Sequence, residues 1–331
     1  MAAHERRGPP AHGRILASGF RPAPGLAGPH RQTLAGGAWP VLKGPRIHRE
    51  RWELPDGDFT DIDWVSASAD NASWALVLPG ILGNIRSPYV CHLLGRLSRA
   101  GYRAGMLNHR GLSGMPNRLA PAYHAGFTRD LDQVARRLAE NDGPGIVIGF
   151  SMGGSVVLKW LGENASNTPV TAATAVSVPF QLAPAADSLH TGGAGFYGGY
   201  LLRGLRRQTA RKFSTIATPF PMPPSKDIRT LRDFDDRITA PLHGFAGADD
   251  YYARSSSLPW LRRIAVPTLI VNAVDDPLVP RESLPGPADL SPSVTLELAD
   301  RGGHVGFLGR GRYGCPRFWL DDRLLAFLRG T

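Results

Sequence analysis

The stretch that decides the fold is Gly149-Phe150-Ser151-Met152-Gly153-Gly154. It follows Ile146-Val147-Ile148, which predicts a short buried strand, and it precedes a helix-forming stretch at 155–161. A strand, a Gly-x-Ser-x-Gly turn and a helix form a nucleophile elbow, where glycines make room for a strained turn that exposes the serine hydroxyl. The helix amino terminus, including the Met152 N–H, then faces a developing oxyanion. We predict Ser151 as a nucleophile; the alternative is a chance turn in a chain with 39 glycines.

A serine nucleophile of this kind needs an acid and a histidine, which follow it in that order along the chain. After His243 the sequence contains one histidine, His304. Residues 267–273 predict a buried strand that runs directly into Asp275 and Asp276, and the carboxyl end of a strand suits an acid that orients a histidine. We predict Asp276 as this acid, because it stands just before a proline turn, with Asp275 as the second candidate. The simpler interpretation is a plain Asp/Pro turn and a loop histidine without a role.

Apolar runs separated by chain breakers predict an alternation of strands and helices. The expected elements are a hairpin at 47–64, strands at 74–78, 103–108, 146–148, 170–178, 267–273 and 294–298, and helices at 88–100, 126–140, 155–161 and 316–328. This alternation predicts an α/β fold, a mostly parallel sheet with helices on both faces.

The segment from about 180 to 258 is irregular and rich in glycine, proline and aromatic residues, which predicts a cap insertion. Its aromatic side chains either line an apolar pocket over Ser151 or form a small core of the cap itself. The residues concerned are Phe180, Phe196, Tyr197, Tyr200, Phe213 and Phe220.

Several longer motifs resemble the YheT-type branch of the α/β-hydrolase superfamily, which also includes ABHD-type lipases. They lie at 29–33, 54–64, 108–118, 123–130, 158–163, 234–236, 240–245, 251–252 and 303–307, and the resemblance covers roughly residues 18 to 328. It implies an α/β-hydrolase fold, with Ser151, Asp276 and His304 as the catalytic triad and the backbone N–H of Ile81 as a second oxyanion donor beside that of Met152. The implied activity is hydrolysis of short- to medium-chain carboxylic esters, acylglycerols among them, through an acyl-enzyme.

The chain departs from that family where His-Gly-Leu-Glu-Gly is usual, since it has Pro79-Gly80-Ile81-Leu82-Gly83. The glycine and the donor position are kept, but the flanking His and Glu are not, which leaves the substrate open. An acyltransferase with the same triad is one alternative function, and a non-catalytic binding protein on this fold is another. The complete Ser, Asp and His set argues against the second, whereas the first depends on which alcohol reaches the acyl-enzyme.

Other polar residues have plainer interpretations. His30, His109 and His124 with Asp130 match no metal-ligand spacing, so we expect buried hydrogen-bonding roles for them, and we expect no metal and no cofactor. Four further residues, together with Asp130, are expected to hold the loop beside the active site: Arg110, Asn117, Arg118 and Tyr123.

Length and composition agree with one domain at 18–331, preceded by a disordered tail at 1–17. That tail has no apolar stretch typical of a secretory signal, and no run approaches the 18 apolar residues of a transmembrane helix. Cys91 and Cys315 are too few for a disulfide framework. We therefore expect a cytoplasmic protein.

The net charge of +10 raises the question of a nucleic-acid partner. Only four of the 38 basic residues are lysines, the arginines are dispersed, and no nucleic-acid-binding signature accompanies them. We therefore predict no nucleic-acid partner, and a small-molecule or lipid ester as the substrate. One basic and apolar stretch, 201–212, is either a cap helix with a solvated basic face or a weak contact with an anionic membrane surface.

Overall fold

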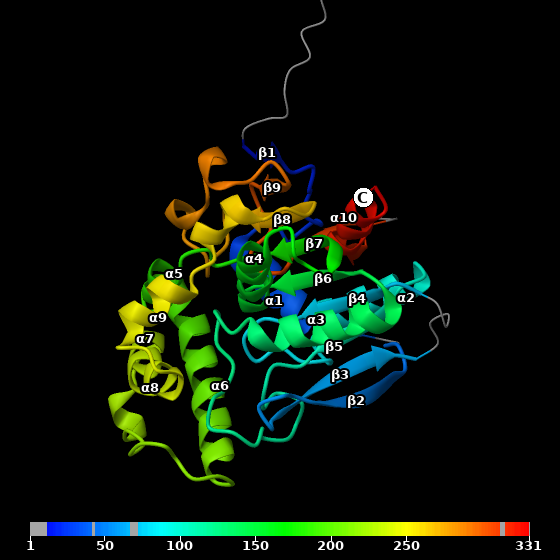
Figure 1. Cartoon of the computed structure of the whole chain (residues 1–331). Coiled ribbons are helices and arrows are strands. Elements are labelled where there is room, and N and C mark those ends of the chain that lie inside the picture. Colours follow the sequence, from blue (N-terminus) through cyan, green and yellow to red (C-terminus); the bar gives the residue numbers. More distant parts are fainter. Residues whose placement is uncertain (1–11, 42–43, 67–71, 312–314, 331) are drawn as a thin grey trace, which may run out of the picture.

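The computed structural model describes residues 12–41, 44–66, 72–311 and 315–330 (Figure 1). Nine strands form one sheet in the order β1-β9-β8-β7-β6-β4-β5-β3-β2. From β1 to β5 all neighbouring strands in this order are parallel. The two remaining pairs, β5 with β3 and β3 with β2, are antiparallel. The strands are β1 (Arg14–Ala17), β2 (Ile47–Glu53), β3 (Phe59–Val65), β4 (Trp74–Leu78), β5 (Arg103–Leu107), β6 (Gly145–Phe150), β7 (Val170–Val176), β8 (Thr268–Ala273) and β9 (Val294–Ala299). The predicted, mostly parallel α/β sheet is confirmed.

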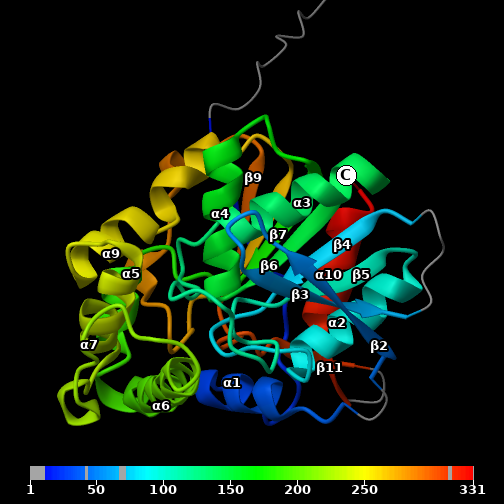
Figure 2. The same ribbon diagram turned by 60° about the horizontal axis from the view of Figure 1, so that its bottom comes forward.

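Helices cover both faces of this sheet, so its central strands are buried on both sides and are almost continuously apolar. In β4, Leu76 and Leu78 face one core, whereas Ala75 and Val77 face the other, because successive side chains of a strand point in opposite directions. The first core is closed by α3 (Arg129–Asp142) and α4 (Met152–Asn164), the second by α2 (Pro88–Arg99) and α10 (Trp319–Leu328). Figures 1 and 2 show α3 and α4 on one side of the strands and α2 and α10 on the other.

The chain between β7 and β8 forms a group of helices to one side of the sheet (Figure 1). They are α5 (Leu182–Ser188), α6 (Gly195–Phe213), α7 (Leu231–Phe234), a π-helical turn (Asp235–Thr239), α8 (Ala240–His243) and α9 (Ala248–Ser255). We call the segment 180–258, where the sequence predicts an insertion, the cap. Part of it packs around a core of its own that includes Tyr197, Leu202 and Phe234.

Three parts of the sequence interpretation need correction. The predicted disordered tail extends too far, because β1 (Arg14–Ala17) lies in the sheet beside β9; residues 1–11 fall outside the described part of the chain. Its apolar run is only three residues long, Ile15 to Ala17, and most of its side chains are exposed, so the run alone does not indicate a strand of the sheet. The last helix begins at Trp319, because β11 (Pro316–Phe318) pairs with β10 (Leu308–Arg310). The helix α1 (Pro29–Ala38) was not predicted; it lies beside α6 in Figure 2.

Candidate active site

Ser151 occupies the sharp turn between β6 and α4. Its φ of 52° and ψ of −121° are strained for a residue with a side chain. The turn is tight on both sides: a Cβ on Gly149 would lie 2.5 Å from Gly153 O, and one on Gly153 would lie 2.4 Å from Pro79 O. Only glycine fits at these two positions, as the elbow motif requires.

The structure brings Ser151, His304 and Asp276 together from three separate segments. His304 Nε2 lies 2.9 Å from Ser151 Oγ, and His304 Nδ1 lies 2.9 Å from Asp276 Oδ2 and 3.1 Å from Oδ1. An ionised carboxylate only accepts hydrogen bonds, so Nδ1 carries the imidazole proton and Nε2 is left to accept from the serine hydroxyl. This tautomer is the one that a general base beside a serine nucleophile needs.

The two neighbouring aspartates after β8 have different partners. Asp276 accepts a hydrogen bond from Leu278 N at 2.8 Å, and its side chain is fully buried beneath His304. Asp275 Oδ1 accepts from Gly303 N at 3.0 Å, so it holds the loop that carries the histidine. Burial raises the pKa of Asp275. Of the two acids that the sequence left open, Asp276 is the one that reaches the imidazole.

The loop around His304 is held by α1, a contribution that sequence reasoning missed. His304 N donates to Thr33 Oγ1 at 2.9 Å, and Leu308 N donates to Gln32 Oε1 at 2.8 Å. Gln32 is completely buried and returns a hydrogen bond to Leu308 O at 3.1 Å. Val305 N donates to Ser177 Oγ at 3.0 Å. The motif at 29–33 was the only sequence signal for this role.

The loop after β4 carries Ile81, the predicted second oxyanion donor. Gly80 N donates to Tyr89 Oη at 3.1 Å, and the hydroxyl of Tyr123 accepts from the backbone of Leu82. His109 Nε2 lies 2.9 Å from Pro79 O. Since a carbonyl oxygen accepts, this nitrogen carries a proton, and burial lowers the pKa of His109 to about 4, which keeps the ring neutral. The positions on both sides of Ile81 are therefore fixed.

Ser151, His304, Met152 and Ile81 open into one cavity of about 120 Å³ beneath the cap. Most of its other lining residues are apolar and come from the cap: Leu182, Ala185, Ala186, Leu189, Leu201, Leu205, Leu231, Phe234, Tyr251 and Tyr252. None of the six aromatic residues proposed from the sequence is among the lining residues. Phe180 lies in the core between the sheet and the helices α3 and α4, and Tyr197 lies in the core of the cap. Phe196 and Tyr200 are 69% and 62% exposed. The first of the two sequence interpretations is therefore wrong for these residues.

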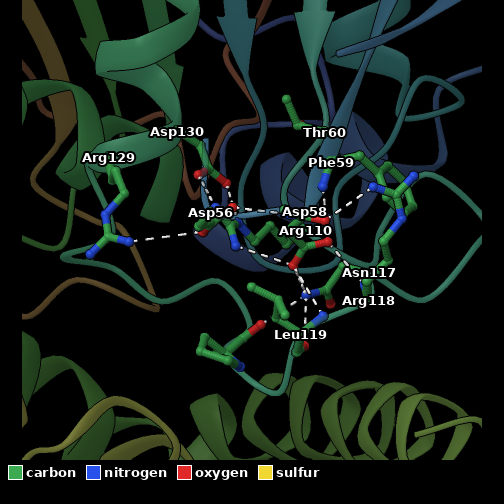
Figure 3. A network of polar contacts seen from close by, with 12 residues as sticks. Asp56, Asp58, Phe59, Thr60, Arg110, Asn117, Arg118, Leu119, Arg129 and Asp130 are labelled. Carbon is green, nitrogen blue, oxygen red and sulfur yellow. Dashed lines mark hydrogen bonds and ion pairs between the residues drawn. The ribbon is translucent and has the colours of Figure 1, made fainter. Parts of the chain in front are cut away.

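A buried polar network holds the loop that follows β5 (Figure 3). Arg110 donates two hydrogen bonds of 2.7 Å to Asp130 and one of 3.1 Å to Asp58, and it forms an ion pair of 2.8 Å with Asp56. Asp58 also accepts from Asn117 Nδ2 at 2.6 Å. The arginine side chain is 1% exposed, so its charge must be balanced within the protein. The expectation that these residues hold the loop agrees with these contacts.

One cap residue joins this network. Lys212 Nζ, on α6, donates to Asn117 Oδ1 and to Pro121 O, both at 2.8 Å. The lysine is 5% exposed, and burial lowers its pKa to about 8. Neither sequence interpretation of 201–212 therefore holds for its last residue, because Lys212 attaches the cap to the sheet domain.

The histidines expected to have buried hydrogen-bonding roles all have hydrogen-bond partners, but the expectation of burial is wrong for His30, which is exposed. His30 Nδ1 lies 3.0 Å from Tyr197 Oη, which connects α1 to the cap, and His124 Nδ1 accepts from Gly126 N at 3.1 Å. Within the described ranges, no group of three His, Cys, Asp or Glu side chains could hold a metal ion. No helix of those ranges is long and apolar enough to cross a membrane.

Comparison with known proteins agrees with this fold. Residues 76–310 match the family model described as alpha/beta hydrolase fold. YheT of Escherichia coli (strain K12), a protein named as an esterase, is 37% identical over 93% of this chain and 92% of its own length. Phospholipase ABHD3 of Homo sapiens is 31% identical over 80% of this chain and 67% of its own length. A monoacylglycerol lipase of Saccharomyces cerevisiae is 28% identical over 88% of this chain and 65% of its own length.

Among solved structures, the esterase Pf2001 of Pyrococcus furiosus superposes with a TM-score of 0.54 at 14% identity, over 98% of this chain and 99% of that one. At that identity the likeness concerns the fold alone. The sequence relatives carry the assignment further: the chain is an esterase- or lipase-like enzyme and belongs to the α/β-hydrolase family, in its YheT-type branch.

Proposed function

We propose that this enzyme hydrolyses short- to medium-chain carboxylic esters, acylglycerols among them, through an acyl-enzyme on Ser151. The observation that carries the proposal is the continuous hydrogen-bonded path from Asp276 through His304 to Ser151, which ends in a largely apolar cavity. A base within hydrogen-bond reach of a serine, itself oriented by a carboxylate, is the arrangement that activates a hydroxyl nucleophile.

In the proposed first half-reaction, His304 Nε2 takes the proton of Ser151 as Oγ attacks the ester carbonyl carbon. The negative charge that develops on the carbonyl oxygen is stabilised by the backbone N–H groups of Met152 and Ile81. Asp276 keeps the imidazole in the required tautomer and stabilises the imidazolium. His304 then protonates the leaving alcohol, and water resolves the acyl-enzyme in the same way.

A serine at the elbow excludes chemistry that needs an aspartate nucleophile there. The cavity supports an ester with a small apolar part, because a cavity of about 120 Å³ is close to one of about 150 Å³ that holds benzene. We further propose a cytoplasmic location, supported by a sequence with only two cysteines.

We include a weak contact with anionic lipid surfaces in the proposal. Phe196 and Tyr200 expose most of their side chains on α6, and Arg203 and Arg207 are exposed further along the same helix. Aromatic and cationic side chains together suit the boundary between headgroups and acyl chains. Sedimentation with anionic and with neutral vesicles tests this contact. If the protein binds neither kind of vesicle, the contact is removed from the proposal.

Labelling with a fluorophosphonate probe tests the nucleophile. The wild-type protein should react at Ser151, and Ser151→Ala should lose the label together with about 10⁴- to 10⁶-fold in turnover of p-nitrophenyl butyrate. Ser214→Ala, an exposed serine at the end of α6, is the matched control and should keep both. Label that persists in Ser151→Ala would show that another residue is the nucleophile.

A further inference from the structure

Asp235 is the one acidic side chain among the described residues that line the cavity beside Ser151 and His304. It begins the π-helical turn Asp235–Thr239 in the cap. Turns of this kind are rare and occur frequently at functional sites. The other cap residues around the cavity are mainly leucine, alanine and aromatic residues, so a carboxyl group here is chemically out of place in a pocket for a plain acyl chain.

The carboxyl group of Asp235 is only partly satisfied by the protein. Thr239 Oγ1 donates to Oδ1 and Tyr252 Oη donates to Oδ2, each at 2.8 Å. Two carboxylate oxygens together offer about four acceptor sites, so Asp235, which lines the cavity, can accept further hydrogen bonds.

Within the described ranges, Asp235 has no ion-pair partner. Arg232, three residues earlier, pairs instead with Asp187 and Asp249. Burial raises the pKa of Asp235 to about 6, although the two hydroxyl donors lower it, so the group is mostly ionised at neutral pH.

A hydrocarbon occupant would leave the remaining acceptor sites of this carboxylate without hydrogen bonds, which costs free energy. An occupant with a hydroxyl group at this point would donate a hydrogen bond instead. The other hydroxyl groups of the lining have partners already: Tyr251 Oη accepts from Ala125 N, and Tyr123 Oη lies 3.3 Å from Gln208 Oε1. Asp235 is therefore a charged group of the lining that can discriminate between a polar and an apolar occupant.

We propose that Asp235 selects esters whose cavity-bound part carries a hydroxyl group, which donates a hydrogen bond to its carboxylate. This inference rests on the proposed ester hydrolysis at Ser151 and names the substrate class of that site: hydroxyacyl esters, or esters of a polyol such as glycerol. Which half of the ester enters the cavity decides between these two forms.

Two matched substrate pairs test the proposal and separate its two forms. The acyl pair is p-nitrophenyl 3-hydroxybutyrate against p-nitrophenyl butyrate, and the alcohol pair is glyceryl monobutyrate against propyl butyrate. For one of the pairs, the wild-type enzyme should favour the hydroxylated ester by about tenfold or more in kcat/KM, the effect of a hydrogen bond to a charged group. That preference should weaken as the pH falls below about 6, where Asp235 takes up a proton.

Substitutions then assign the preference to Asp235. Asp235→Leu should abolish it, largely because the plain ester improves, whereas Asp235→Asn should retain part of it, since a carboxamide oxygen still accepts. The exposed neighbour Asp236 does not line the cavity, so Asp236→Asn should keep the wild-type ratio. Melting temperatures show that each variant is folded, and the isosteric Asp235→Asn keeps the test decisive if Asp235→Leu does not fold.

A ratio near one in the wild-type enzyme for both pairs would overturn the proposal. So would a ratio that is unchanged in folded Asp235→Asn or Asp235→Leu, because Asp235 would then only connect its turn to α9 through Tyr252. Failure of the proposed function has a different signature: no member of either pair would be hydrolysed, and no fluorophosphonate label would appear at Ser151.

Discussion

His109 and Pro79 are joined by a hydrogen bond of 2.9 Å between the imidazole Nε2 and the backbone carbonyl oxygen. The bond connects the loop after β5 to the loop after β4, which carries Ile81. The His109 ring also stacks on Tyr123, with ring centres 5.0 Å apart. The loop that carries Ile81 is thus positioned by two residues that themselves lie outside the proposed reaction path.

The first prediction concerns this positioning. His109→Ala should lower kcat by roughly 10- to 100-fold with little change in KM, because a displaced Ile81 amide weakens binding of the transition state more than of the substrate. A boronic acid, which mimics the tetrahedral intermediate, should bind more weakly by a similar factor. His109→Gln, whose carboxamide can still donate to Pro79 O, should recover part of the loss. His48→Ala, at an exposed site on β2, is the control. A weaker substrate affinity, seen as a higher KM without a fall in kcat, would point to a purely structural effect.

The second prediction separates the two aspartates after β8. Asp276→Asn should reduce kcat by roughly 10⁴, because the carboxamide favours the wrong imidazole tautomer. Asp275→Asn should cost far less, since its amide oxygen can still accept from Gly303 N. Steady-state rates with p-nitrophenyl butyrate measure both effects. The reverse ranking would contradict the assignment of Asp276 as the acid.

The third prediction concerns the size of the cavity. In a series of p-nitrophenyl esters from acetate to palmitate, each added methylene should raise kcat/KM by up to about three- to fourfold while apolar surface is still being buried. The increase should end near butyrate to hexanoate, because a cavity of about 120 Å³ holds roughly six carbon atoms by comparison with a benzene-sized cavity. A rate that continues to rise up to palmitate would indicate an open groove instead.

The fourth prediction is a loss of stability in mild acid. Burial lowers the pKa of His109 and of His243 to about 4 each, against about 6.5 in an unfolded chain. Between these values the unfolded state binds more protons, so the free energy of unfolding falls as the pH drops from 6.5 towards 4.

His243→Gln tests this stability prediction. The substitution should reduce the slope of unfolding free energy against pH by up to one proton, about 1.4 kcal/mol per pH unit. Urea unfolding at several pH values gives this slope for the wild-type protein and the variant. An unchanged slope would show that His243 also titrates normally in the folded state.

The fifth prediction concerns the attachment of the cap. Lys212→Met should destabilise the protein by about 1–3 kcal/mol, because Asn117 Oδ1 and Pro121 O lose a buried donor. Limited proteolysis should cut the cap faster in this variant. Lys226→Met, at an exposed site, should match the wild-type protein in both assays. Equal cleavage rates for the two variants would show that other contacts attach the cap.

The sequence by itself determined the elements whose pattern is local. The continuous apolar run at Ile146–Ile148 and the glycines around Ser151 predict a buried strand and a tight turn, because backbone sterics and side-chain periodicity act between neighbours in the chain. The same kind of pattern placed β4, β8 and β9 to within a residue or two. For the site, residue type, chain order and family resemblance singled out Ser151, Asp276 and His304.

Only the tertiary structure decided what depends on contacts between distant segments. β1 has only a short apolar run and joins the sheet by pairing with a strand from the far end of the chain, with Arg14 opposite Thr295 of β9. Whether Asp275 or Asp276 reaches His304 depends on the direction of each side chain after β8, which composition does not encode. Hydrophobicity did not predict that Phe196 is exposed or that Asp235 lines the cavity. The packing of the cap helices, rather than residue type, sets which faces enclose the cavity.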